Sequence, residues 1–233
     1  MATEGSEWAQ NALNDAILST VIRRCLSSTS TALDVGAAHG RFAGEMSRVA
    51  TDGYVLAIEP VPALNTYLRR IFRSKTNVVI LPCAIGRENT QTNFWICDSN
   101  VGLSGLAVTN AARESGDMRL ITVPVKTIDS IAADFKSIDL IKIDVEGGEY
   151  DVLLGAQETL SDHRPIVAFE CTGHAEGYDT RPEETFRLFA RLGYQLFTPT
   201  GYLRSSRSLS EQFFVECITG GHEFFFFAAH PGD

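Results

Sequence analysis

The feature that most constrains the fold of this 233-residue chain is an alternation of short apolar, β-branched runs with longer segments of helical period. Such alternation predicts an α/β fold, a doubly wound parallel sheet with helices on both faces, because each parallel strand needs a crossover connection that packs on the sheet. The early connections, 41–49 and 63–72, repeat apolar residues at intervals of three and four, as helices do. We expect strands at 32–35, 54–58, 78–81, 138–143, 166–169, 194–197 and 224–229.

No internal repeat or linker divides the chain, so we expect a single domain over residues 1–233. Its first part, 1–30, is predicted to be a helical segment with a helix over 8–26. The stretch 86–125 is too long for a simple connection and holds two strand-like runs, which indicates an inserted flap or hairpin. The stretch 201–221 is expected to be irregular. The phenylalanines of 224–227 predict a buried strand, since the run is too short to span a membrane.

Composition indicates which classes of binding partner and which cellular compartment to expect. The net charge of −9 and the absence of a basic stripe argue against nucleic acid as a partner. A polar N-terminus and the lack of a long apolar run argue against a signal peptide and an integral membrane segment. The five cysteines are scattered and odd in number, which argues against a disulfide framework or a zinc knuckle and favours reduced thiols. We therefore expect a cytoplasmic protein.

The turn after the first strand has the residues of a ligand pocket. The strand reaches Asp34 and passes through Gly36 and Gly40 into a helix, so that the backbone and the helix N-terminus can approach a ligand closely. A dinucleotide fingerprint is absent because Ala38 and Arg41 stand where its second and third glycines would be. No phosphate-binding P-loop is present either. The turn predicts a nucleotide-type pocket without close approach of a pyrophosphate.

A carboxylate follows the second strand. Glu59 lies about twenty residues after the glycine turn, where such folds hold a ribose diol, and Pro60 follows it. The alternative interpretation is a solvated glutamate beside a turn-forming proline.

Further acidic residues follow the fourth and fifth strands. Asp144, Glu146 and Glu149 surround two glycines, and Glu170 ends the next strand shortly before His174. Carboxylates so close together require a cation, a ligand or a buried proton to compensate their charge. Because ligands of doubly wound sheets bind outside the carboxyl ends of the strands, these residues predict a site at that edge.

These segments closely resemble the FkbM family of S-adenosylmethionine-dependent methyltransferases. The most specific part is the block from Ile141 to Glu149 together with the later Leu153-Leu154-Gly155-Ala156. The other matching segments, in chain order, are Asp34–Ala37, Ile58–Pro60, Leu81–Gly86, the Ser104 region and Val125–Asp129. The likeness fades beyond Glu170.

The resemblance implies a Rossmann-like, seven-stranded methyltransferase sheet whose last strand is antiparallel, S-adenosylmethionine as cofactor, and O-methylation of a hydroxyl on a small molecule, sugar, lipid or polyketide. It implies that Gly36, Ala37 and Gly40 line the methionine portion, with Asp34 contacting its ammonium directly or through the turn. Glu59 would hold the ribose, Cys83 and Ala84 would border adenine through backbone groups, and Asp144 would lie nearest the methyl donor. The complete cofactor-binding set is Asp34, Gly36, Ala37, His39, Gly40, Glu59, Pro60, Cys83, Ala84 and Asp144.

An alcohol acceptor must lose its proton during methyl transfer, so a carboxylate or imidazole is expected as general base. The candidates are Glu146, Glu170 and His174, with Asp144 as an orienting group. Alternatively, Asp144 and Glu170 would bind a divalent cation that coordinates the acceptor oxygen. No metal ligand set is assigned.

Two rival classes are weighed against the methyltransferase. A nicotinamide-dependent oxidoreductase needs the three-glycine fingerprint and a Tyr-x-x-x-Lys pair, and the chain has neither. A non-catalytic ligand-binding module would be expected to lose acidic residues from the site, and none is missing. Methylation of protein or nucleic acid is a weaker rival, since the Asn/Asp-Pro-Pro-Tyr block is absent. Acceptor identity and oligomeric state stay open.

Overall fold

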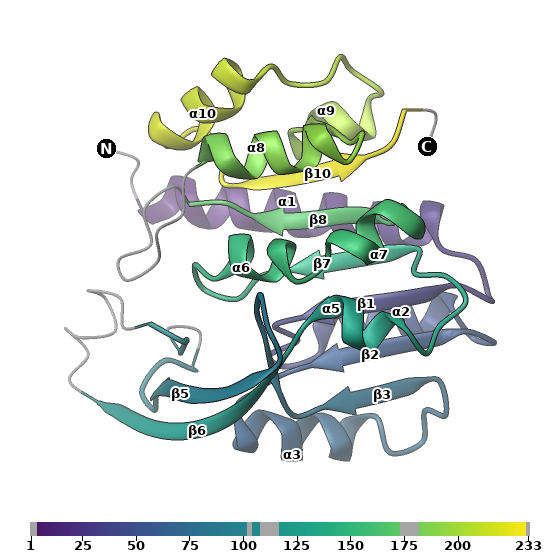
Figure 1. The fold of residues 1–233 in the computed structure, drawn as a ribbon, viewed down its shortest axis with the longest axis vertical. Coiled ribbons are helices and arrows are strands. Elements are labelled where there is room, and N and C mark those ends of the chain that lie inside the picture. Colours follow the sequence, from purple (N-terminus) through teal and green to yellow (C-terminus); the bar gives the residue numbers. More distant parts are fainter. Residues whose placement is uncertain (1–3, 102–103, 108–116, 173–181, 232–233) are drawn as a thin grey trace.

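The computed structural model describes residues 4–101, 104–107, 117–172 and 182–231, and its centre is a seven-stranded sheet (Figure 1). The strands are parallel except β10, which pairs antiparallel with both β8 and β9. In spatial order they are β3 (Val78–Leu81), β2 (Tyr54–Ile58), β1 (Thr31–Val35), β7 (Leu140–Ile143), β8 (Ile166–Glu170), β10 (Phe225–Ala229) and β9 (Gln195–Phe197). The predicted fold class is confirmed, and each predicted run overlaps one of these strands.

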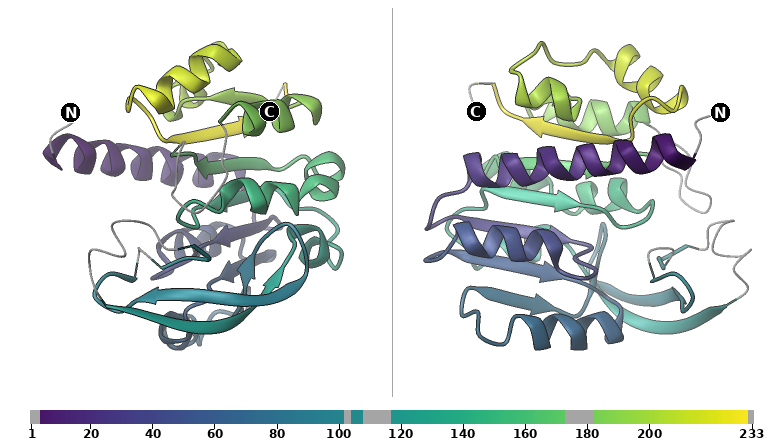
Figure 2. Two further views of the ribbon diagram at one scale, coloured as in Figure 1. Left: turned by 60° about the vertical axis from the view of Figure 1, so that its left-hand side comes forward. Right: turned by 180° about the vertical axis from the view of Figure 1, so that it is seen from behind.

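Helices cover both faces of the sheet, as Figures 1 and 2 show from opposite sides. One face carries α1 (Glu4–Cys25), α2 (Arg41–Val49) and α3 (Pro62–Ile71), and the other carries α5 (Ile128–Ala132), α6 (Glu149–Leu154), α7 (Gln157–Asp162) and α8 (Pro182–Arg191). Successive strand residues enter different cores: Leu33 and Ile141 pack on the α5–α8 side, whereas Ala32 packs on the α1–α3 side. Both faces being buried explains why the central strands are continuous apolar runs.

The segment 86–125 contributes most of a second, three-stranded sheet. β5 (Thr90–Cys97) pairs antiparallel with β6 (Met118–Lys126), and β4 (Ala84–Ile85) pairs parallel with β6. Phe94 packs with Val61 and Leu64 of the α3 region in a separate small core. The hairpin therefore lies against the carboxyl edge of the main sheet, where β2 and β3 end (Figure 1).

The stretch 201–221 is not irregular, which corrects the expectation from the sequence. It contains the end of α9 (Pro199–Leu203) and the whole of α10 (Glu211–Thr219). Ser210 caps α10, because its hydroxyl accepts the Phe213 N–H at 3.2 Å. Phe214, Cys217 and Ile218 are buried on one face of this helix. The helix has only nine residues, so its helical spacing of apolar residues is too short to be distinctive in the sequence.

The final strand is buried on both sides, as its phenylalanines predict: every residue of β10 is buried. Among the described residues, no helix combines the length and apolar character that a membrane crossing requires.

The connections of the sheet run outward in both directions from its centre. The chain passes from β1 to β2 and β3 on one side, and from β7 to β8 on the other. The carboxyl ends of β1 and β7 therefore flank the point at which the strand order reverses, which is where doubly wound sheets bind ligands.

Candidate active site

A cavity of about 330 Å³ opens at this reversal point, between the carboxyl ends of β1, β2 and β7 and the β5–β6 hairpin. Its apolar wall comes from strand ends, the start of α3 and the hairpin. Its polar groups come from the turns after the main-sheet strands and, for Asn100 and Ser104, from the segment between β5 and β6. The lining residues are Val35, Gly36, Ala38, His39, Ile58, Glu59, Pro60, Val61, Leu64, Cys83, Ala84, Ile85, Phe94, Asn100, Val101, Ser104, Leu106, Asp144, Val145, Glu146 and Gly148.

The turn after β1 is built around a glycine in the left-handed region. Gly36 has a φ of 76°, and a Cβ at this position would lie 1.8 Å from the Asp144 carbonyl oxygen. The N–H groups of Gly36 and Ala37 both donate to the Ile58 carbonyl at 3.0 Å, which fixes the turn on β2. The close approach of the β1 turn to the end of β7 therefore requires glycine.

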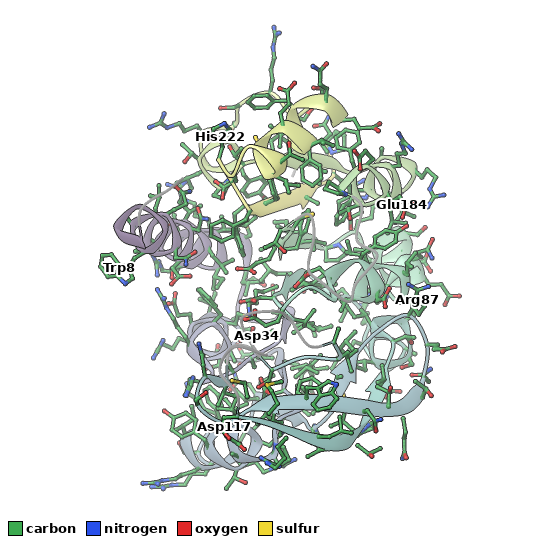
Figure 3. All side chains as sticks on the ribbon, turned by 90° about the vertical axis from the view of Figure 1, so that its left-hand side faces the viewer. Trp8, Asp34, Arg87, Asp117, Glu184 and His222 are labelled. Carbon is green, nitrogen blue, oxygen red and sulfur yellow. The ribbon has the colours of Figure 1, made fainter. Side chains whose placement is uncertain are left out.

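Asp34, Ala37 and Gly40 lie behind the cavity wall and do not line it. Asp34 is buried inside the molecule (Figure 3), and its Oδ2 accepts the Ala43 N–H at 2.8 Å. Burial raises the pKa of this carboxyl, although Lys142 and the Ala43 bond act in the opposite direction. Asp34 thus supports the turn and the start of α2 from below.

Glu59 and Pro60 line the cavity at the end of β2. The Glu59 carboxylate accepts the Val61 N–H at 2.8 Å on Oε1 and the Ala38 N–H at 2.9 Å on Oε2. Burial raises its pKa, and the two backbone bonds lower it. The carboxylate is fixed in orientation, and each oxygen keeps a lone pair for a further donor.

Cys83 and Ala84 line the cavity beyond β3, as does His39 from the β1 turn. Burial raises the pKa of the Cys83 thiol to about 11, so the sulfur is an unreactive part of an apolar wall. The exposed His39 ring lies edge-on to Tyr67, with ring centroids 5.7 Å apart. The sequence placed these three residues at the site but missed Phe94, whose place depends on how the hairpin folds back.

The acidic loop after β7 is shaped by Glu149. Its Oε1 accepts the N–H groups of Val145 at 3.0 Å and Gly147 at 3.1 Å. Glu146 is held between them with a φ of 61°, a conformation that costs on the order of 1 kcal/mol or more for a residue other than glycine. Asp144 and Glu146 line the cavity, whereas Glu149 is buried beneath them.

Burial, with a smaller contribution from neighbouring acids, raises the pKa values of Glu146 and Glu170. Burial, then Asp144 and Glu149, raise the pKa of Glu146 to about 7. Burial and the same neighbours also raise the pKa of Glu170, at the end of β8, well above its usual range. Glu170 does not line the cavity. A carboxyl group that titrates near neutral pH and faces a cavity is suited to accept a proton.

Lys142, directly behind the cavity wall, is a second residue that the sequence did not predict for the site. It is 3% exposed, and its ammonium lies 3.1 Å from Asp144 Oδ2 and 3.5 Å from Asp34 Oδ1. Burial alone would lower the pKa of this lysine, but Asp144 and Asp34 outweigh burial, and the pKa is raised. The available signal was a lysine inside an otherwise apolar buried strand, Leu140–Ile143.

The remaining predictions concern His174 and a metal. His174 lies outside the described residues. The described part of the chain contains no group of three or more His, Cys, Asp or Glu side chains arranged to hold a metal ion. Asp144, one of the two acids that the sequence offered as ligands of a divalent cation, pairs with the Lys142 ammonium.

The doubly wound sheet and the acid-lined cavity at its reversal point define a Rossmann-like α/β protein. The sequence profile of the methyltransferase FkbM domain matches residues 34–196, and the chain belongs to this methyltransferase family. It is 28% identical over 144 residues to Methyltransferase 1 of Beauveria bassiana, which covers 54% of this chain and 58% of that protein. The crystal structure of an FkbM methyltransferase from Methylobacillus flagellatus superposes with a TM-score of 0.52 at 17% identity.

The chain spans less than two thirds of the length of each of these relatives. It covers 44% of the Methylobacillus protein, although 87% of its own length is matched, and 58% of the fungal one. The superposition supports the fold, and the profile supports the family.

Proposed function

We propose that this protein is an S-adenosylmethionine-dependent methyltransferase that methylates a hydroxyl group on a small molecule, sugar, lipid or polyketide-type acceptor. The observation that carries the proposal is the cavity at the reversal point, which has a fixed Glu59 carboxylate at one strand end and Asp144 with Glu146 at another. Membership of the FkbM methyltransferase family supports it.

The residues of the cavity fit the proposed cofactor. Glu59 has a free lone pair on each oriented oxygen, as a ribose diol requires. Cys83 and Ala84 lie beside an apolar wall suited to a flat base. Asp144 and Glu146 supply negative charge where the cationic portion would lie, and such charge favours the cationic cofactor over its neutral product.

When bound, S-adenosylmethionine supplies a methyl group already activated on a sulfonium. The chain must then orient the acceptor oxygen, exclude water and take up the hydroxyl proton. Among the three candidate bases, we assign this role to Glu146, whose carboxylate would hold the proton after transfer. It lines the cavity and has a pKa of about 7, whereas Glu170 does not line it.

Titration calorimetry of the full chain with S-adenosylmethionine, followed by methyl-transfer assays on a panel of hydroxyl compounds, tests the proposal. We expect one cofactor site and transfer to oxygen. Binding without transfer to any acceptor class would support the non-catalytic alternative, and absence of binding would refute the proposal. The metal alternative is tested in the same assay, since a metal-independent enzyme keeps its activity in the presence of a chelator.

Glu146→Gln tests the assigned base. General bases contribute about 10²–10⁴-fold to rate, so we expect kcat to fall within that range. The Kd for the cofactor should rise by a smaller factor, because Asp144 keeps its negative charge. In the wild type, kcat/KM should rise with pH up to about 7, because only the ionised Glu146 accepts a proton. Glu88→Gln, an exposed loop change, is the matched control. Wild-type kcat in Glu146→Gln would exclude this base.

A further inference from the structure

Lys142 joins the two strand ends that form the floor of the cavity. It is the register partner of Asp34 across β1 and β7, although the two residues are 108 positions apart in the sequence. Its ammonium pairs with Asp34 at 3.5 Å and Asp144 at 3.1 Å, and donates to the Gly36 carbonyl at 2.9 Å. The Phe42 ring lies 5.9 Å away on another side.

The bond to Gly36 fixes the orientation of the glycine turn. The peptide group between Gly36 and Ala37 is held at both ends: its carbonyl accepts from Lys142, and its N–H donates to the Ile58 carbonyl at 3.0 Å. The turn cannot rotate this peptide without breaking both bonds. Because Gly36 lines the cavity, Lys142 determines the backbone surface that a ligand meets there.

The bond to Asp144 fixes a carboxylate that faces the cavity. The Asp144 side chain is 34% exposed, whereas the Lys142 side chain is 4% exposed. One oxygen therefore contacts the buried ammonium, and the group as a whole reaches the cavity wall. Among the described residues, the ion pairs of Asp34 and Asp144 are both made with Lys142.

From this geometry we propose that Lys142 is a positioning residue of the methyl-transfer site, which holds the glycine turn and the Asp144 carboxylate in one arrangement and places its positive charge beside the acids of the site. The expected effect of Lys142 on the kinetics of methyl transfer rests on the proposed function. Its expected effect on the titration of Glu146 in the apo protein does not. Lys142 does not itself reach the reacting atoms, since it is absent from the cavity lining.

The charged groups with which Lys142 interacts are all acidic among the described residues. They are Asp34 on β1, Glu59 after β2, Asp144 and Glu146 after β7 and Glu170 on β8, and Glu149 on α6 interacts in turn with Asp144. The ammonium lowers the pKa of Glu59, Glu146 and Glu170 against the effect of their burial. Without it, Glu146 would take up its proton at higher pH.

The first test uses the apo protein and needs no catalysis. Carboxyl ¹³C NMR titrations of Lys142→Met should show the Glu146 midpoint raised above its wild-type value by about one pH unit or more, the Glu146 signal being assigned with Glu146→Gln. Lys136→Met, which removes the same charge from an exposed loop, should leave the midpoint unchanged. An unchanged midpoint in folded Lys142→Met would overturn the proposal.

The second test separates positioning from mere stability. The pH profile of kcat/KM in Lys142→Met should move to higher pH with kcat reduced about tenfold or more, and Lys142→Arg should restore the inflection because it keeps the charge. A less stable variant with the wild-type profile would refute positioning. If Lys142→Met does not fold, the double variant Lys142→Met with Asp34→Asn is used, because it also removes the buried Asp34 carboxylate that the first change leaves unpaired. Both the NMR titration and the pH profile are then measured on the double variant. If the wild type transferred no methyl group, the proposed function would be refuted, whereas the NMR test of Lys142 would remain valid.

Discussion

Carboxylates of the same chemical type have different roles in this site because their partners differ. Asp34 is buried between the Ala43 N–H and Lys142, and it supports the backbone. Glu59 accepts two backbone N–H groups and faces the cavity with its remaining lone pairs. Glu146 is held by the loop in a left-handed conformation, among other acids, and its pKa is about 7. At the scale of one residue, the role of each carboxylate depends on the hydrogen bonds and ion pairs that it makes within the protein.

Glu59→Gln should weaken binding of S-adenosylmethionine by roughly ten- to a hundredfold, because a hydrogen bond to a charged group contributes about 1.5–3 kcal/mol. The new amide also places an NH₂ group against one of the two N–H donors, so a modest loss of stability is expected. Calorimetric Kd values and thermal unfolding check both effects, with Glu88→Gln as control. An unaltered Kd would show that Glu59 does not contact the cofactor.

Gly155→Ala should destabilise the protein by a few kcal/mol. A Cβ at Gly155 would lie 2.2 Å from the Gly86 carbonyl oxygen, so the end of α6 must separate from the start of the hairpin segment. Gly44→Ala is the matched control: its Cβ would make only ordinary contacts, the nearest at 3.7 Å, and alanine favours the helix by about 0.5–1 kcal/mol. Urea unfolding of both variants measures the difference, and equal stabilities would contradict this packing.

At the scale of elements, the β5–β6 hairpin is a wall of the cavity with a small core of its own. Phe94, Ile96 and Val125 pack there against Val61 and Leu64, separate from the two cores of the main sheet. Such a satellite core can open without unfolding the sheet. We therefore expect the hairpin to open at a lower free-energy cost than the main sheet.

Phe94→Ala should loosen the hairpin selectively. Removing a buried phenylalanine side chain costs about 3–5 kcal/mol, and this cost falls on the small core. Hydrogen exchange should accelerate in 90–97 and 118–126 while the central strands β1 and β7 keep their protection. Uniform acceleration across all strands would show that hairpin and sheet unfold as one unit.

At the scale of the whole molecule, the fold places several acids of a chain with a net charge of −9 close together at one edge of the sheet. Burial raises the pKa of Glu146, Glu149 and Glu170 in the folded state. The folded protein then binds more protons than the unfolded chain above the usual carboxyl range. These groups stabilise the fold at low pH and destabilise it as pH rises through their folded pKa values.

Glu146→Gln should therefore stabilise the apo protein in a pH-dependent way. With a folded pKa of about 7 against a usual 4.5, the gain should be near zero below about pH 4 and reach roughly 3 kcal/mol at most by about pH 8. Urea unfolding of variant and wild type across this range measures the gain. A constant difference, or one that shrinks as pH rises, would contradict the raised pKa.

Much of the site could be predicted because strand ends in a parallel sheet share one edge. Glu59 and Asp144 follow apolar runs, so their placement needs only the fold class. His174 stays a prediction, as do the single domain and the cytoplasmic location. The order of residues did not reveal that Ala37 and Gly40 lie behind the wall, because which side of a turn faces a cavity depends on the neighbouring strand.

The sequence by itself determined the alternation of elements, the sheet class and the set of acids at its edge, since these follow from local periodicity and chain order. Only the tertiary structure decided which of those acids are paired. The contact of Lys142 with Asp34 depends on the register of β1 against β7, and the bonds of Glu149 depend on the path of the loop after β7. Register and loop path are set by packing between distant segments, which no local pattern encodes.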